Sequence, residues 1–138
     1  RVPIETTGQL ADIIAQALPA KSRRRPGHPA KRSFQAIRIA VNDELGGLAQ
    51  GLASAIDALH SGGRLVVLSF HSLEDRIVKV TLAAAARGCV CPKDLPVCVC
   101  GRTPALRLLT RRPLTADPTE LAENRRARSA KLRAAEKL

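Results

Sequence analysis

The sequence predicts an α/β fold on two observations. Residues 64–69, RLVVLS, form a nearly continuous apolar run, which is typical of a parallel strand buried on both faces of a sheet. Apolar residues at helical spacing precede this run over residues 34–59 and follow it over residues 72–87. The other strand candidates are 105–113 and 126–136, and the second of these also fits a short helix. These are too few partners for a doubly buried strand, so we expect part of an α/β domain.

The composition indicates one domain with a strongly basic surface. Of the 138 residues, 45% are apolar, which is enough for a core, and 23 lysines and arginines face 12 acidic residues, for a net charge of +11. Such an excess attracts polyanions, so we expect a nucleic-acid partner. A basic surface that serves solubility, or an acidic counterpart elsewhere, is the alternative.

The scarcity of aromatic residues and the lack of a long apolar run argue against two classes of protein. The chain has no tryptophan or tyrosine and two phenylalanines, Phe34 and Phe70, which argues against a platform that stacks single-stranded bases. No apolar run is long enough to span a membrane, and no signal peptide is evident. We expect a cytoplasmic protein without a membrane partner.

The N-terminal part predicts a helix followed by a basic loop. Residues 6–18 show an apolar face at helical spacing, and Thr6 with Gln9 matches a capping box. Residues 19–33 contain three prolines and one glycine and predict a loop. No acidic residue follows its basic residues until Asp43, which favours a phosphate-binding loop over a solvated linker. These residues are Lys21, Arg23, Arg24, Arg25, Lys31 and Arg32.

Residues 34–59 predict a long helix that Gly46 and Gly47 bend or split, and residues 60–63, HSGG, end it. A polar stripe runs beside its apolar one, and such stripes usually face solvent. We expect Phe34 to anchor the core rather than to stack on a base. The stripe consists of Arg32, Gln35, Arg38 and Asn42.

The turn between the strand and the following helix is the candidate site. Ligands of open α/β sheets bind beyond the carboxyl ends of the strands. His71 has the chemistry to donate a hydrogen bond to a substrate carbonyl or to move a proton near neutral pH. A serine hydrolase is a weaker alternative because no GxSxG motif is present. The residues at this position are Ser69, Phe70, His71 and Ser72.

Part of the same motif has a structural explanation. Ser72 with Asp75 fits a capping box, and Asp75 can pair with Lys79 one turn later. Glu74 is therefore assigned to capping and solvent, while Asp75 and Arg76 are kept as supports of the site. The residues expected to face inward from this helix are Leu73, Ile77, Val80 and Ala84.

Four cysteines form two CxC pairs, Cys89 with Cys91 and Cys98 with Cys100. They could supply four thiolates to one zinc ion, and a cytosolic setting disfavours disulfides. Zinc ribbons ordinarily use CxxC pairs at longer separations, however. We therefore assign no metal site, expect free or buried thiols, and keep zinc as the alternative.

Four stretches together resemble the bacterial 16S ribosomal RNA cytosine N4-methyltransferases that use S-adenosylmethionine. They cover most of the chain in the family's order. One departure is Arg125, where the family usually has a proline after the asparagine; this alters a turn rather than a chemical group. The stretches are HPAKRSFQAIRIAVNDEL (28–45), GGRLVVLSFHSLEDRIVK (62–79), CPKDLPVCVCGRTPALRLLTRRPL (91–114) and ENRRARSAKLRAAE (123–136).

The resemblance implies a class I, Rossmann-like methyltransferase fold. Residues 1–33 would be the end of a helical substrate-recognition domain with its basic loop, and residues 34–138 the C-terminal half of the methyltransferase domain. The last two strands would form an antiparallel pair at the sheet edge. The family's cofactor-binding motifs lie upstream of the stretches matched here. Cofactor-binding residues are therefore unassigned, and the missing N-terminal half of the same protein is an expected partner.

The implied activity is transfer of a methyl group from S-adenosylmethionine to N4 of a cytosine in the decoding region of 16S ribosomal RNA. The partner would be this RNA or the small ribosomal subunit, and Ser69, Phe70, His71 and Ser72 would line the pocket. The residues implied to hold RNA are Arg23, Arg24, Arg25, Lys31, Arg32, Arg38 and Asn42.

Three further expectations concern the chain by itself. We expect it to be inactive alone, because its cofactor site would be incomplete. A non-catalytic RNA-binding module is the main alternative, and a small zinc-ribbon adaptor is another. The unpaired flank of the strand predicts marginal stability or self-association, for example as a homodimer.

Overall fold

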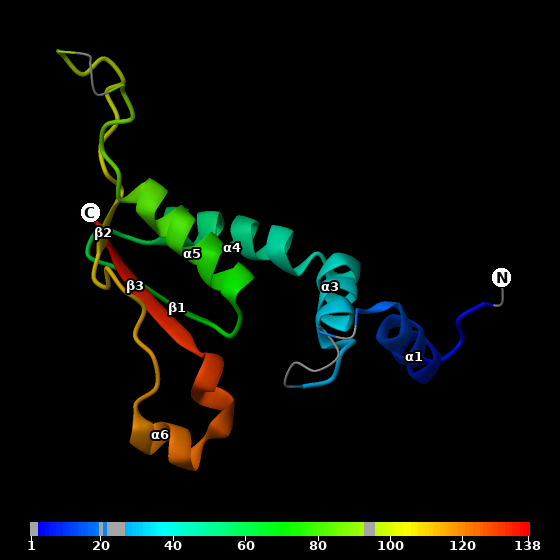
Figure 1. Ribbon diagram of the computed structural model, residues 1–138. Coiled ribbons are helices and arrows are strands. Elements are labelled where there is room, and N and C mark those ends of the chain that lie inside the picture. The colour runs from blue at the N-terminus through cyan, green and yellow to red at the C-terminus, as the bar shows by residue number, and fades with distance from the viewer. Residues whose placement is uncertain (1–2, 20, 22–26, 93–95) are drawn as a thin grey trace. The chain divides into compact units, whose positions relative to one another are not determined.

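The structure is a computed structural model in which the chain forms two units, Arg1–Glu44 and Leu45–Leu138. Figure 1 shows the helices and strands of both units. The residues described are 3–19, 21, 27–92 and 96–138. The predicted phosphate-binding residues Arg23, Arg24 and Arg25 lie outside these ranges.

The first helix, α1, spans Thr7–Ala17 and confirms the helix predicted from the capping box. The Thr6 hydroxyl accepts a hydrogen bond from the Gln9 N–H at 3.2 Å, and the Gln9 side-chain oxygen accepts one from the Thr6 N–H at 3.2 Å. None of the residues of α1 is buried, so its apolar face remains open in the described part of the chain.

The single long helix predicted over residues 34–59 is two helices. α3 spans Lys31–Asn42 and α4 spans Glu44–Ala58, and Asp43 between them has a left-handed backbone with φ 47°. Aspartate adopts this conformation more readily than most residues. The chain breaks there and not at the Gly46–Gly47 pair, which continues α4, so the predicted position of the break is wrong.

The second unit contains an antiparallel sheet in the order β1-β3-β2. β1 spans Arg64–Ser69, β2 spans Leu106–Leu108 and β3 spans Lys131–Lys137. The expected antiparallel pairing of the last two strands is confirmed. β1 also pairs antiparallel with β3, and among the described strands it has no parallel partner. The prediction of a parallel setting for β1 is therefore not met within this chain.

The remaining elements connect these strands. α5 spans Ser72–Ala85, and the short helix α6 spans Pro118–Glu123, capped by the Asp117 carboxylate, which accepts from the Glu120 N–H at 2.8 Å. The segment predicted as a strand or a short helix is both in turn, because the 3₁₀ helix η1 (Arg125–Ser129) precedes β3.

The core lies on one face of the sheet, where α4 and α5 pack side by side (Figure 1). Strand side chains alternate between the two faces, so Leu65 and Val67 join this core while Val66 and Leu68 are 57% and 53% exposed. The prediction that β1 is buried on both faces is wrong for this chain. The buried core residues are Leu52, Ile56, Val78, Leu82, Leu106 and Ala135.

The face of α5 predicted to point inward is largely wrong. Val78 and Leu82 are buried, and of the predicted residues Ile77 alone packs against the core. Leu73 and Val80 are 42% and 60% exposed. The apolar residues of α5 lie on all sides of the helix, so their spacing did not identify the buried face.

We expect Gly62→Ala to lower the free energy of unfolding by about 1–2 kcal/mol, because Gly62 has φ 81° in the turn before β1 and L-residues are strained there. Gly51→Ala is the matched control: Gly51 lies exposed inside α4 with nothing within 4 Å of an added Cβ, and the change should stabilise by about 1 kcal/mol. Urea unfolding followed by circular dichroism measures both. Equal effects of the two substitutions would contradict the assigned turn geometry.

Candidate active site

The four residues predicted from the strand-to-helix turn lie together at the carboxyl end of β1. Ser69 is 4% exposed, and its hydroxyl donates to the Lys131 carbonyl at 3.4 Å. Phe70 follows with 52% of its surface exposed. Ser72 is the exposed first residue of α5. The turn thus exposes the Phe70 ring and Ser72, whereas the Ser69 hydroxyl links β1 to β3.

His71 caps α5 in a reciprocal arrangement with Glu74. The His71 Nδ1 accepts from the Glu74 N–H at 3.3 Å, and Glu74 Oε2 accepts from the His71 and Phe70 N–H groups at 3.1 and 2.8 Å. The predicted capping role of Glu74 is confirmed, but the capping box predicted for Ser72 and Asp75 is wrong by one residue. The turn is therefore held by its own backbone donors.

The capping bond determines which nitrogen of His71 is available. Because Nδ1 accepts a hydrogen bond, the neutral ring carries its proton on Nε2. Nε2 is buried and has no hydrogen-bond partner among the described residues. Glu74 Oε1 lies 3.3 Å away, but that contact does not have hydrogen-bond geometry. A ring donor without an acceptor at a strand end is a group that a ligand could satisfy.

The start of α5 is attached to β3 by a buried ion pair. Arg133 Nε and Nη2 donate to the two Asp75 carboxylate oxygens at 2.7 and 3.2 Å, and Lys131 Nζ lies 3.3 Å from Oδ2. Asp75 and Arg133 are 8% and 7% exposed. The pairing of Asp75 with Lys79 predicted from the sequence is therefore wrong, because a partner 58 residues away takes the carboxylate.

This contact makes stability depend on pH in a definite direction. The Arg133 hydrogen bond, with help from Lys131, holds the pKa of Asp75 below its ordinary 3.8 despite burial. The unfolded chain then binds the proton more readily than the folded chain. The stabilisation is present above pH 3.8 and is lost as the pH falls through the lower folded pKa.

We expect Asp75→Asn to lower the free energy of unfolding at pH 7 by about 3 kcal/mol, because it leaves the Arg133 guanidinium buried without its counter-ion. Urea unfolding of the chain at several pH values tests this. The difference from the unsubstituted chain should narrow as the pH falls below 3.8. Asp57→Asn, at an exposed position on α4, is the control and should change little. A pH-independent difference would contradict the assignment.

In the first unit, the predicted RNA-binding residues of α3 are exposed. Lys31 and Arg32 are helical, not part of the loop predicted over residues 19–33. Arg38 donates to the Glu44 carboxylate at 2.8 and 3.2 Å, and the Asn42 amide donates to it at 3.2 Å. The arginine keeps 57% of its side chain exposed within this pair. Of the two arginines in the polar stripe, Arg32 thus has the charge that the described neighbours neutralise less.

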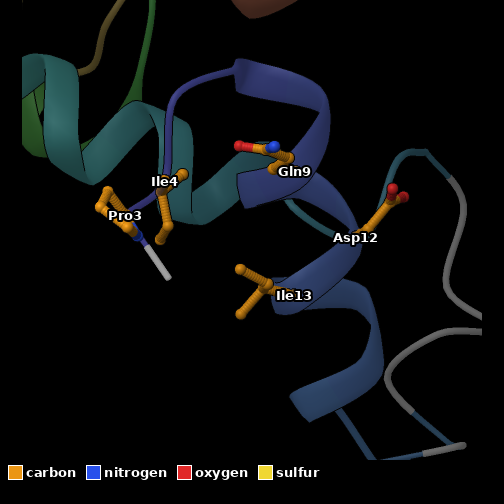
Figure 2. A pocket seen from close by; sticks show the side chains of 5 residues that line it. All are labelled: Pro3, Ile4, Gln9, Asp12 and Ile13. Carbon is orange, nitrogen blue, oxygen red and sulfur yellow. The ribbon is translucent and has the colours of Figure 1, made fainter. Parts of the chain in front are cut away.

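Among the described residues are two open pockets lined by side chains other than those of the turn. One is beside α1, where Figure 2 shows Pro3 and Ile4 on one side and Ile13 on the other, with Gln9 and Asp12 completing it. The other is lined by Leu121, Arg125 and Arg128 near α6 and η1. The first is mainly apolar, and the second carries two arginines suited to an anion.

The four cysteines converge in the loop between α5 and β2. Their sulfur atoms all lie within 4.8 Å of one another. The Val90 and Arg102 N–H groups lower the pKa of Cys100 to about 6. The Cys91 N–H lowers the pKa of Cys89, but the neighbouring Cys98 and Cys91 thiols outweigh it and raise that pKa to about 12. These hydrogen bonds thus favour the thiolate at Cys100 and the thiol at Cys89.

Sequence reasoning missed Arg133 and Lys131 as supports of the turn. The available signal was the alternation KLRAAEK in β3, which places both basic residues on the same face of a strand. Their register opposite Val67 and Ser69 puts that face beneath the start of α5.

No helix in the described part of the chain is both long enough and apolar enough to cross a membrane.

Comparison with known proteins gives one consistent result. A family model described as the MraW methylase family matches residues 1–138. Over 136 residues, the chain is similar to proteins named ribosomal RNA small subunit methyltransferase H. The identities are 60% for Heliobacterium modesticaldum, 61% for Symbiobacterium thermophilum and 63% for Geobacter sulfurreducens.

The extent of these matches is asymmetric. Each covers 99% of this chain, but 44%, 43% and 44% of the three relatives, respectively. The chain thus spans less than half the length of these relatives.

Proposed function

The chain belongs to the MraW methylase family, and we propose on that basis that it forms part of an enzyme that methylates N4 of a cytosine in 16S ribosomal RNA. The observation that carries the proposal is the similarity over 99% of the chain to proteins named ribosomal RNA small subunit methyltransferase H. The geometry of the turn after β1 supports it, because this is where α/β enzymes bind ligands.

The chemistry makes definite demands on such a site. The cofactor, S-adenosylmethionine, would supply a methyl group bound to a positively charged sulfur. The cytosine amine is a weak nucleophile because its lone pair is delocalised into the ring. The protein therefore contributes positioning, together with acceptors for the positive charge that develops on nitrogen. A base inside a duplex or a stacked loop must also be extruded before it can be reached.

The described residues do not form a cradle for this cofactor. A cofactor loop of the usual kind places glycines directly after a strand, where backbone N–H groups approach the ligand. The glycines around β1 instead lie before it, at Gly62 and Gly63, and the turn after it consists of Phe70 and His71. The chain therefore contributes the acceptor side of the site, and we expect residues beyond this chain to hold the cofactor.

The turn after β1 supplies three groups for the base. The half-exposed Phe70 ring stacks on the extruded cytosine. The Ser72 hydroxyl accepts from the amine as it gains positive charge. The Nε2–H of His71 donates to an acceptor on the ring edge of the base. This nitrogen is covered in the structure, with Glu74 Oε1 3.3 Å away, so the base reaches it only after a local rearrangement of the turn.

The role of His71 can be separated from its capping role with two substitutions. His71→Asn keeps a side-chain acceptor for the Glu74 N–H, so α5 stays capped, but it removes the ring donor. We expect the whole protein carrying this change to retain its stability and to lose about 10²-fold in methyl transfer. His71→Ala should lose both activity and about 1 kcal/mol of stability.

Transfer of radiolabelled methyl to small ribosomal subunits measures activity, and thermal unfolding measures stability. If His71→Asn transferred methyl at the normal rate, His71 would be a helix cap alone and the pocket assignment would be wrong.

The first unit provides the proposed RNA contact. Lys31, Arg32 and Arg38 place positive charge on α3, and Asn42 extends the same polar stripe. The basic residues Arg23, Arg24 and Arg25 stay part of this proposal, although they lie outside the described residues. Contacts of this kind hold phosphates and position the RNA without selecting the base.

We expect Arg32→Gln to weaken RNA binding and to reduce the slope of log affinity against log salt by about 1, because one phosphate contact is lost. Arg107→Gln is the control, since Arg107 is exposed but paired with Glu136 at 2.6 Å on the second unit. Filter binding to a 16S ribosomal RNA fragment at several salt concentrations measures both. Identical slopes for the two variants would contradict a specific role for α3.

The net charge of +11 also favours a second function, a non-catalytic RNA-binding module. The two functions differ in what the turn contributes. In a non-catalytic module, His71→Asn would leave the affinity for RNA unchanged. That affinity would fall as the salt concentration rises and would not depend on the base sequence.

A further inference from the structure

The loop between α5 and β2 brings together four sulfur atoms at distances that suit a single ion. The Cys91 and Cys98 sulfurs are 4.0 Å apart, those of Cys98 and Cys100 are 3.5 Å apart, and those of Cys100 and Cys89 are 3.9 Å apart. Four sulfurs at the corners of a tetrahedron, each about 2.3 Å from a central zinc ion, are about 3.8 Å from one another. The observed separations lie on both sides of that value.

The loop's two CxC pairs explain how this cluster arises. The single residue between the two cysteines of each pair lets both sulfurs face the same side of the loop. The valines between and beside them, Val90, Val97 and Val99, are 50%, 70% and 77% exposed. The cysteines of the outgoing and returning segments thus turn toward each other while the valines turn outward.

The neck of the loop is closed independently of the sulfurs. The Ala105 N–H donates to the Ala85 carbonyl at 2.9 Å, and the Arg102 guanidinium donates to the Ala84 carbonyl at 3.4 Å. Gly88 packs against Pro104, whose Cδ would lie 3.3 Å from an added Cβ. This closure holds Cys89 and Cys100 near each other without any ion.

Beyond its neck, the described residues of the loop form no apolar core of their own. None of the described residues between Arg87 and Pro104 is buried. Short segments that cannot bury apolar surface are commonly ordered by a cross-link or a metal ion. The four cysteines are free, and the Cys98 and Cys100 sulfurs, 3.5 Å apart, are well beyond the roughly 2 Å of a disulfide.

From these distances we infer that Cys89, Cys91, Cys98 and Cys100 bind one structural zinc ion as a four-thiolate site. Four thiolates with no fifth ligand position form a closed site, which orders the loop and has no open coordination position for catalysis. Binding releases the thiol protons and leaves the complex with a charge of −2. This replaces the interpretation as free thiols, which rested on the atypical spacing of the CxC pairs.

A backbone contact to one of the sulfurs agrees with this assignment. The Cys91 N–H lies 3.4 Å from the Cys89 sulfur, so a backbone donor already points at one ligand. Tetrahedral sets of four sulfurs select zinc or iron among biological metals. A closed set of four thiolates is typical of structural zinc sites, and iron would be recognised by its colour.

The test is the metal content of the 138-residue chain purified without an affinity tag under reducing conditions and dialysed against metal-free buffer. We expect one zinc per chain by mass spectrometry of the metal. After removal of zinc with chelator, addition of Co²⁺ should produce the intense visible bands of tetrahedral cobalt bound to thiolates.

Two variants and a control make the assignment specific. Cys91→Ser and Cys98→Ser should each lose most of the zinc and the cobalt bands, whereas Val99→Ser, at an exposed position between two ligands, should retain both. Circular dichroism checks that each variant keeps its helices.

Absence of zinc together with absence of cobalt bands in the reduced, unsubstituted chain would overturn the inference. Equal zinc in Cys98→Ser and Val99→Ser would also overturn it, because the metal would then be adventitious. Iron in place of zinc, with an equal loss in the cysteine variants, would overturn the identity of the ion.

Discussion

The buried contact between Asp75 and Arg133 is the constraint on which the arrangement of the second unit depends. A two-pronged contact fixes both the position and the rotation of α5 over β3, which apolar packing alone does not do. Rotation of α5 in turn decides where its first residues point. Because α5 starts directly after His71 and in this orientation, His71 can cap the helix and the Phe70 ring stays exposed beside β1.

The sequence predicted those features that depend on interactions between residues close together in the chain. The capping box of Thr6 and Gln9, the glycine turn before β1 and the position of the strand-to-helix turn all depend on neighbours within a few residues. The buried face of α5 could not be obtained in this way. That face carries Asp75, which pairs with Arg133 58 residues further along the chain, and no spacing within α5 contains that information.

The same distinction applies to the sites. The sequence identified Ser69–Ser72 as a candidate because strand ends are common ligand sites, but the covered Nε2 of His71 required the geometry of Glu74. The convergence of the cysteines was equally invisible, since a spacing says how many residues separate two pairs and not whether the loop folds back. One helix connects the two regions: α5 begins at the turn with His71 and ends at the neck of the cysteine loop.

The closed neck has a consequence for how this protein can vary. Its two ends are joined by the hydrogen bonds from Ala105 to Ala85 and from Arg102 to Ala84, so the contacts described between the loop and the core lie at its neck. Doubling the length of a flexible loop adds only about 0.6 kcal/mol of closure entropy. The segment between the ends is therefore a natural place for insertion or replacement, and a foreign peptide or tag grafted there would leave the sheet and both helices of the core in register.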